Sequence, residues 1–125
     1  MDNKIQTSLW GAGVELDVYF EQLDYDEPTE VQLDAFARVD EVWAQVDAAV
    51  PHIIDYVRDE AANLGNSVEE NGVFELVHPT TLFIAESEQR VVAILCEFDY
   101  DPEHGLAVVF ENERFKEVGA QDIVL

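Results

Sequence analysis

The feature that most constrains the fold is an uninterrupted apolar run at residues 91–96 (VVAILC), between two polar segments. Successive side chains of a strand point to opposite faces of a sheet. A strand that is apolar at every position must therefore be covered on both faces. We expect this run to form the central strand of a sheet, within a strand that spans residues 90–98.

The segments around this run predict a C-terminal meander. Residues 81–85 precede it as a strand, and residues 106–110 (LAVVF) follow it after a polar turn. A further turn at 111–113 leads to a last strand at 114–118. His78-Pro79 is predicted to break the chain before the meander, and the sequence leaves residues 73–77 open between a helical turn and a strand.

An N-terminal hairpin is predicted from strict alternation. One face of residues 14–20 is apolar and the other is mostly acidic: Val14, Leu16, Val18 and Phe20 against Glu15, Asp17 and Tyr19. This pattern is typical of a half-buried strand. Residues 8–10 are expected to form the partner strand. A turn at residues 11–13, where glycine permits positive φ, would connect the two strands.

Residues 33–64 carry apolar side chains at helical spacing, with acidic residues on the opposite side. Thr29 and Gln32 have the spacing of a capping box, so the helix is expected to begin near Glu30. Pro51 predicts a kink or a break near residues 48–51. Asp40 could cap a new segment, and Gly65 is expected to end the helical region.

These elements predict an α+β fold in one domain, residues 1–125. An antiparallel sheet of five to six strands, made from the N-terminal hairpin and the C-terminal meander, would carry a helical layer on one face. A chain of 125 residues with 48% hydrophobic residues can bury a core of its own. The face with Glu15, Asp17 and Tyr19 is expected to meet water in part.

The net charge of −22 limits the partners. Such a field repels nucleic acid and anionic lipid, and it attracts basic protein surfaces. We therefore expect a basic protein partner, no nucleic acid and no membrane. The charge could instead serve only to maintain solubility, or it could reflect adaptation to high salt.

The N-terminus lacks the basic and apolar regions of a secretory signal, and one cysteine cannot form an intrachain disulfide. No apolar run approaches the roughly 20 residues that cross a bilayer. A cytoplasmic location is expected. The sequence does not indicate the oligomeric state.

The turn at residues 99–104 is the clearest polar constellation. His104 with a neighbouring carboxylate could form an acid–base pair, but turn formation by Asp101-Pro102 and Gly105 accounts for the same residues. Its D-x-D-x-E pattern resembles the start of a calcium loop, yet Gly105 falls one position late and Phe110 stands where a glutamate is required. The histidines and the cysteine show no zinc spacing. We expect no metal, no cofactor and no catalytic residue, with Cys96 in the core.

The helical region offers another surface, because an exposed Tyr and His lie among carboxylates there, which is typical of interfaces. Trp10 and Trp43 are instead expected in the core. The candidate partner-binding residues come from the helices and the turn: Glu41, His52, Asp55, Tyr56, Asp59, Asp99, Asp101, Glu103 and His104.

Several short motifs are similar to those of a known group. They are Trp10 before an alternating strand, T-x-x-Q at 29–32, D-x-E-H-G-L at 101–106 and V-G-x-x-D at 118–122. In these motifs the chain resembles a set of small uncharacterised bacterial domains of unknown function. Such small acidic proteins look like immunity proteins of contact-dependent growth inhibition and other polymorphic toxin systems. The resemblance implies a cytoplasmic protein, not an enzyme, that neutralises a cognate toxin domain such as a nuclease. The alternatives are a small enzyme or ligand-binding domain that uses the 99–104 turn, and a salt-adapted housekeeping domain.

Overall fold

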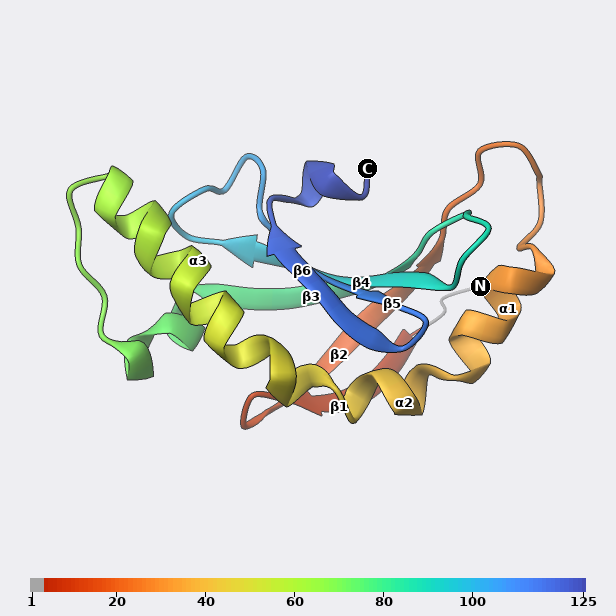
Figure 1. Cartoon of the computed structure of the whole chain (residues 1–125), viewed down its shortest axis with the longest axis horizontal. Coiled ribbons are helices and arrows are strands. Elements are labelled where there is room, and N and C mark those ends of the chain that lie inside the picture. The colour runs from red at the N-terminus through yellow and green to blue at the C-terminus, as the bar shows by residue number, and fades with distance from the viewer. Residues whose placement is uncertain (1–3) are drawn as a thin grey trace.

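A computed structural model describes residues 4–125 as one six-stranded sheet with helices on one face (Figure 1). The strands lie in sequence order: β1 (Lys4–Leu9), β2 (Ala12–Phe20), β3 (Val77–Ile84), β4 (Val91–Phe98), β5 (Leu106–Glu111) and β6 (Arg114–Gly119). The helices are α1 (Glu30–Ala37), α2 (Val39–Trp43) and α3 (Val50–Asn63), with 3-10 helices η1 (Val46–Ala49), η2 (Glu70–Glu75) and η3 (Gln121–Ile123). The predicted α+β class is confirmed.

The sheet is mixed because β2 and β3 are parallel, with Asp17 opposite Thr81 and Phe20 opposite Ile84. All other neighbouring pairs are antiparallel. The chain leaves β2, forms the whole helical layer and re-enters the sheet beside β2. A parallel pair requires a crossover of this kind. The hairpin and the meander thus meet in a parallel pair, which differs from the antiparallel sheet that was expected.

Two hairpins close with two-residue turns in which both residues have positive φ. They are Trp10-Gly11 (φ 51° and 88°) and Asn112-Glu113 (φ 50° and 68°). This geometry matches the twist of the paired strands. The prediction that Trp10 ends a strand is wrong, since the residue lies in the turn. Its indole is partly buried, packs on the core, stacks on Phe74 at 5.3 Å between centroids and donates to the Val46 carbonyl at 3.2 Å.

The helical layer follows its local signals. The Thr29 hydroxyl accepts from the Gln32 N–H at 3.1 Å, the Gln32 side chain accepts from the Thr29 N–H at 2.8 Å, and α1 begins at Glu30 as predicted. Pro51 lies in the first turn of α3, where no intrahelical N–H bond is lost. The helical region changes from η1 to α3 between Ala49 and Val50, which confirms the predicted break near residues 48–51. The prediction that Asp40 caps a segment is wrong, because α2 begins at Val39 after Arg38 and Asp40 lies inside it.

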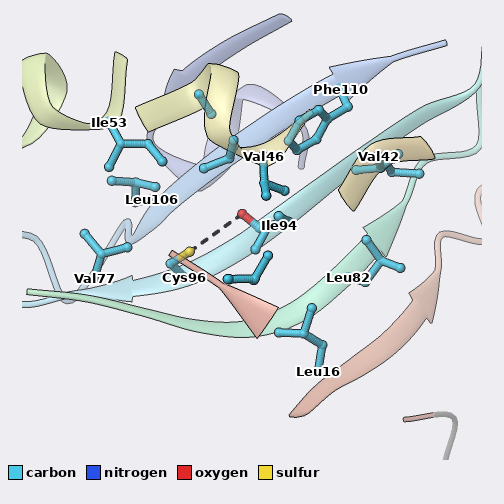
Figure 2. Close-up of a cluster of buried hydrophobic side chains, with 14 of the residues drawn as sticks. Leu16, Val42, Val46, Ile53, Val77, Leu82, Ile94, Cys96, Leu106 and Phe110 are labelled. Atoms are coloured by element: carbon cyan, nitrogen blue, oxygen red, sulfur yellow. Dashed lines mark hydrogen bonds between the residues drawn. The ribbon is translucent and has the colours of Figure 1, made fainter. Parts of the chain in front are cut away.

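The core lies between the helical layer and the sheet (Figure 2). Ile53 and Val57 of α3 and Val42 of α2 face the sheet and are buried. Each such side chain contributes about 1.5–3 kcal/mol of transfer free energy. The strands contribute the buried side chains of Leu16, Leu82, Ile94, Cys96, Leu106 and Phe110. Burial on both faces of β4 confirms it as the central strand.

The opposite face of the sheet has a smaller buried cluster, which consists of Phe83, Ala93, Leu95, Ala107 and Val109. Val124, after β6, packs on this cluster, so the C-terminal segment covers part of this face. Towards β1 the face meets water, as expected: Glu15, Asp17 and Tyr19 are exposed.

The segment before β3 resolves an alternative that the sequence left open. Residues 73–75 belong to η2, and β3 already begins at Val77. His78-Pro79 does not break the strand as predicted. Instead, the register against β4 shifts between Pro79 and Thr81, which places the imino nitrogen at an irregularity. No helix within residues 4–125 is long and apolar enough to cross a membrane.

Candidate functional site

The turn between β4 and β5 is organised by Asp101. Its Oδ1 accepts from the His104 N–H at 3.2 Å and lies 3.0 Å from His104 Nδ1, and its carbonyl accepts from the Gly105 N–H at 2.8 Å. One carboxylate thus holds both the backbone and the imidazole of the turn. This local bonding agrees with the turn-forming interpretation of the D-x-E-H-G segment.

The turn is joined to the C-terminal segment through Gly105 and Gln121. Gly105 has φ 62°, and a Cβ there would lie 2.5 Å from Gln121 Nε2 and 2.7 Å from the Cys96 carbonyl oxygen. Gln121 Nε2 donates to that carbonyl at 3.0 Å, and the Gln121 N–H donates to the His104 carbonyl at 3.0 Å. The E-H-G-L and V-G-x-x-D motifs therefore meet in space, and their glycine and glutamine residues hold the fold together.

Tyr56 on α3 reaches the same end of the molecule. Its ring lies 6.2 Å from Phe98 between centroids. Burial raises the pKa of the Tyr56 phenol, and the carboxylates of Glu60, Asp101 and Asp122 raise it further. The neutral hydroxyl, which can donate a hydrogen bond, is therefore favoured to a higher pH than in an ordinary tyrosine.

We call the group at this end the tip cluster. It comprises side chains from α3, the β4–β5 turn and η3: Tyr56, Glu60, Asp101, Glu103, His104 and Asp122. The hydrogen bond from Asp101 is the main cause of a raised pKa for His104, with smaller contributions from Glu103 and Asp122. Within residues 4–125, no Lys or Arg forms an ion pair with a carboxylate of this cluster.

The other sequence-predicted residues lie around the cluster or away from it. Asp99 pairs with His78 across β3 and β4, at 3.0 Å from Nε2 to Oδ1. The His52 ring lies 4.6 Å from that of Phe115 on β6. Asp55 and Asp59 are exposed on α3.

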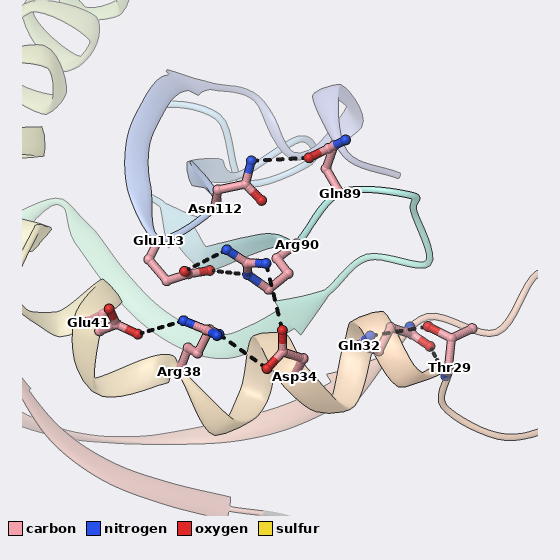
Figure 3. Close-up of polar contacts among 9 residues, drawn as sticks. All are labelled: Thr29, Gln32, Asp34, Arg38, Glu41, Gln89, Arg90, Asn112 and Glu113. Carbon is pink, nitrogen blue, oxygen red and sulfur yellow. Dashed lines mark hydrogen bonds and ion pairs between the residues drawn. The ribbon is translucent and has the colours of Figure 1, made fainter.

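Glu41 belongs to a different group, on α2, where its carboxylate pairs with Arg38 at 3.6 Å (Figure 3). Arg38 also contacts Asp34 at 3.1 Å, and Asp34 contacts Arg90 at 3.7 Å. Arg90 forms a bidentate pair with Glu113 at 2.8 and 3.0 Å, which raises the pKa of the guanidinium. This network joins the helical layer to the β5–β6 turn, so Glu41 sits among paired charges.

Sequence reasoning missed Glu60 and Asp122 as members of the cluster. Glu60 follows Tyr56 by one helical turn, a spacing that places both on one face of a helix. Asp122 closes the V-G-x-x-D motif, but only the fold brings that motif to the turn.

Cys96 lies on β4, the strand that leads into the turn. Cys96 is fully buried, and burial raises the pKa of its thiol above the ordinary range. Among the residues that the structure describes, no three His, Cys, Asp or Glu side chains are grouped to hold a metal ion.

Comparison with family models matches residues 2–125 to a domain of unknown function (DUF6985). The chain belongs to this family. No curated protein and no solved structure matches it. Membership in DUF6985 accords with the resemblance to uncharacterised domains, and it assigns no activity to the tip cluster.

Proposed function

We propose that this DUF6985 chain is an immunity-type protein that binds and neutralises a basic toxin domain, such as a nuclease. The observation that carries the proposal is the tip cluster, in which Asp101 pairs with His104 and the carboxylates of Glu60, Glu103 and Asp122 form no ion pair within residues 4–125. With a net charge of −22, this end would meet a basic cleft favourably. Its carboxylates would occupy the positions of substrate phosphates.

The elements of the cluster suit a binding surface. Tyr56 offers a partly buried aromatic ring beside charge, and aromatic residues are enriched among binding hot spots. Asp101 is held in place by the turn, so little side-chain entropy remains to be lost on binding. Long-range attraction would mainly increase the association rate. Asp55 and Asp59 on α3 extend the acidic surface.

The test is co-expression with the toxin-like product of the adjacent upstream gene, with bacterial growth as the readout. We expect the wild-type chain to restore growth, and a Glu60→Gln, Glu103→Gln, Asp122→Asn variant to protect much less. The matched control, Asp40→Asn, Asp47→Asn, Glu88→Gln, removes equal charge at exposed positions away from the β4–β5 turn and should protect fully. Failure of the wild-type chain to protect, or equal protection by both variants, would overturn the proposal.

A second candidate is an acid–base site, which the 3.0 Å approach of His104 Nδ1 to Asp101 favours. It predicts that His104→Ala abolishes an activity and leaves the melting temperature unchanged. A large loss of stability would instead identify His104 as structural.

A further inference from the structure

The loop between β2 and α1, residues 21–29, is anchored at its first part. The Glu21 N–H donates to the Ile84 carbonyl at 2.9 Å, and the Asp24 N–H donates to Glu86 Oε2 at 2.9 Å. The Glu86 N–H in turn donates to Glu21 Oε1 at 3.0 Å. These bonds hold the start of the loop to the end of β3.

The far end of the loop is held by the capping box and by Gln32, which is completely buried. Gln32 Nε2 donates to the Glu21 carbonyl at 2.7 Å and to the Ile84 carbonyl at 3.1 Å. Figure 3 shows Gln32 turned towards Thr29 at the start of α1. The loop is therefore fixed at both ends, and this preorganisation lowers the entropy cost of binding.

The middle of this anchored loop nevertheless leaves large apolar side chains in water. Leu23 is 69% exposed and Tyr25 is 64% exposed. An open hollow of about 690 Å³ adjoins Tyr25 and is lined by this residue and by residues 26–31. Exposed apolar groups beside a hollow and rimmed by polar residues mark an interaction site.

The charge of the loop restricts what this site can take. Asp24, Asp26 and Glu27 lie among the apolar side chains, and residues 21–37 contain no Lys or Arg. No ion pair within residues 4–125 involves these three carboxylates. At the base of the loop, Glu86 Oε1 is buried and accepts no hydrogen bond from the described residues, which favours an N–H or cationic donor nearby.

We propose that the 21–29 loop is a docking surface for a cationic amphipathic segment of a partner protein, one that carries Arg or Lys beside apolar side chains. Leu23 and Tyr25 would bury the apolar side chains, and the Tyr25 ring could also take a guanidinium on its face. The carboxylates of the loop would pair with the basic residues. The surface is separate from the tip cluster, and the proposal does not require the partner to be a toxin.

The test uses the full chain, labelled for NMR, and two synthetic peptides of roughly 12 residues, about three helical turns. The first peptide has Arg along one face and Leu along the other, and in the second every Leu is Ser. We expect the first to bind about 10-fold more tightly, because buried apolar anchors dominate binding energy, and to shift amide signals of residues 21–31. Equal binding of both peptides, or shifts centred on the tip cluster, would overturn the proposal.

Variants of the chain distinguish peptide binding at the 21–29 loop from a general attraction of cationic peptides to the negative charge of the protein. In the double variant Leu23→Ser, Tyr25→Ser, the affinity advantage of the Leu-containing peptide over the Ser peptide should disappear. The affinity for the Ser peptide should stay unchanged. Leu64→Ser, at an exposed apolar position after α3, is the matched control and should keep the advantage. The same advantage in the loop variant and in wild type would contradict the proposal. Neither outcome affects the growth assay of the tip cluster, so the two proposals can fail separately.

Discussion

Gly105 lies where the β4–β5 turn packs against Gln121 of the C-terminal segment. Its φ is positive, and a Cβ at this position would lie 2.7 Å from the Cys96 carbonyl oxygen, so there is no room for a side chain. We expect Gly105→Ala to destabilise the fold by about 2–4 kcal/mol, since strain and a backbone clash combine. Urea unfolding measures the change. Gly13→Ala, where a Cβ meets nothing within 4 Å and φ is not positive, should cost far less; equal costs would contradict this account of the turn.

His104 makes part of the stability dependent on pH. Asp101 raises the pKa of the imidazole, so the folded state binds this proton more tightly than the unfolded state. The contribution is complete below the unfolded pKa of about 6.5 and is lost as pH rises through the folded pKa. Melting temperatures of wild type should therefore fall relative to those of His104→Gln as pH increases across this range. An NMR titration that places the His104 pKa at or below about 6.5 would refute the prediction.

At the scale of elements, Gln32 connects α1, the 21–29 loop and β3. Its side-chain oxygen accepts a hydrogen bond from the Thr29 N–H, and its side-chain nitrogen donates to the Glu21 and Ile84 carbonyls. Gln32→Ala would leave buried polar groups unpaired, and we expect a loss of about 2–4 kcal/mol in the free energy of unfolding. Gln22→Ala, at a position exposed to solvent, should change it by about 0.5 kcal/mol or less. Similar losses in chemical denaturation would show that Gln32 does not have this role.

Local signals predicted many of these elements, because their causes lie within a few residues. The capping box at Thr29, the break near Pro51 and the turn that includes Gly105 all depend on the neighbouring backbone. The parallel pairing of β2 with β3 depends on residues about 60 positions apart, and no local pattern specifies it. For the same reason, the sequence identified Tyr56 and Asp101 separately and not their approach to Asp122.

At the scale of the whole molecule, the charge of −22 should weaken the folded state through self-repulsion. We expect the melting temperature to rise by a few degrees as KCl increases from low concentration to about 0.5 M, because salt screens exposed charges. The Asp40→Asn, Asp47→Asn, Glu88→Gln variant should melt higher than wild type at low salt and show a smaller rise. A chain that unfolds outright at low salt would favour the salt-adapted housekeeping alternative.

The central claim is that the tip cluster binds a basic partner by electrostatic complementarity. Its most direct test is the Kd and association rate of the purified chain with the toxin domain from the adjacent gene, measured across KCl concentrations. We predict that the association rate falls at least about 10-fold between low and high salt and that the Glu60→Gln, Glu103→Gln, Asp122→Asn variant loses most of this dependence. Binding that is insensitive to salt and unchanged in that variant would contradict the claim.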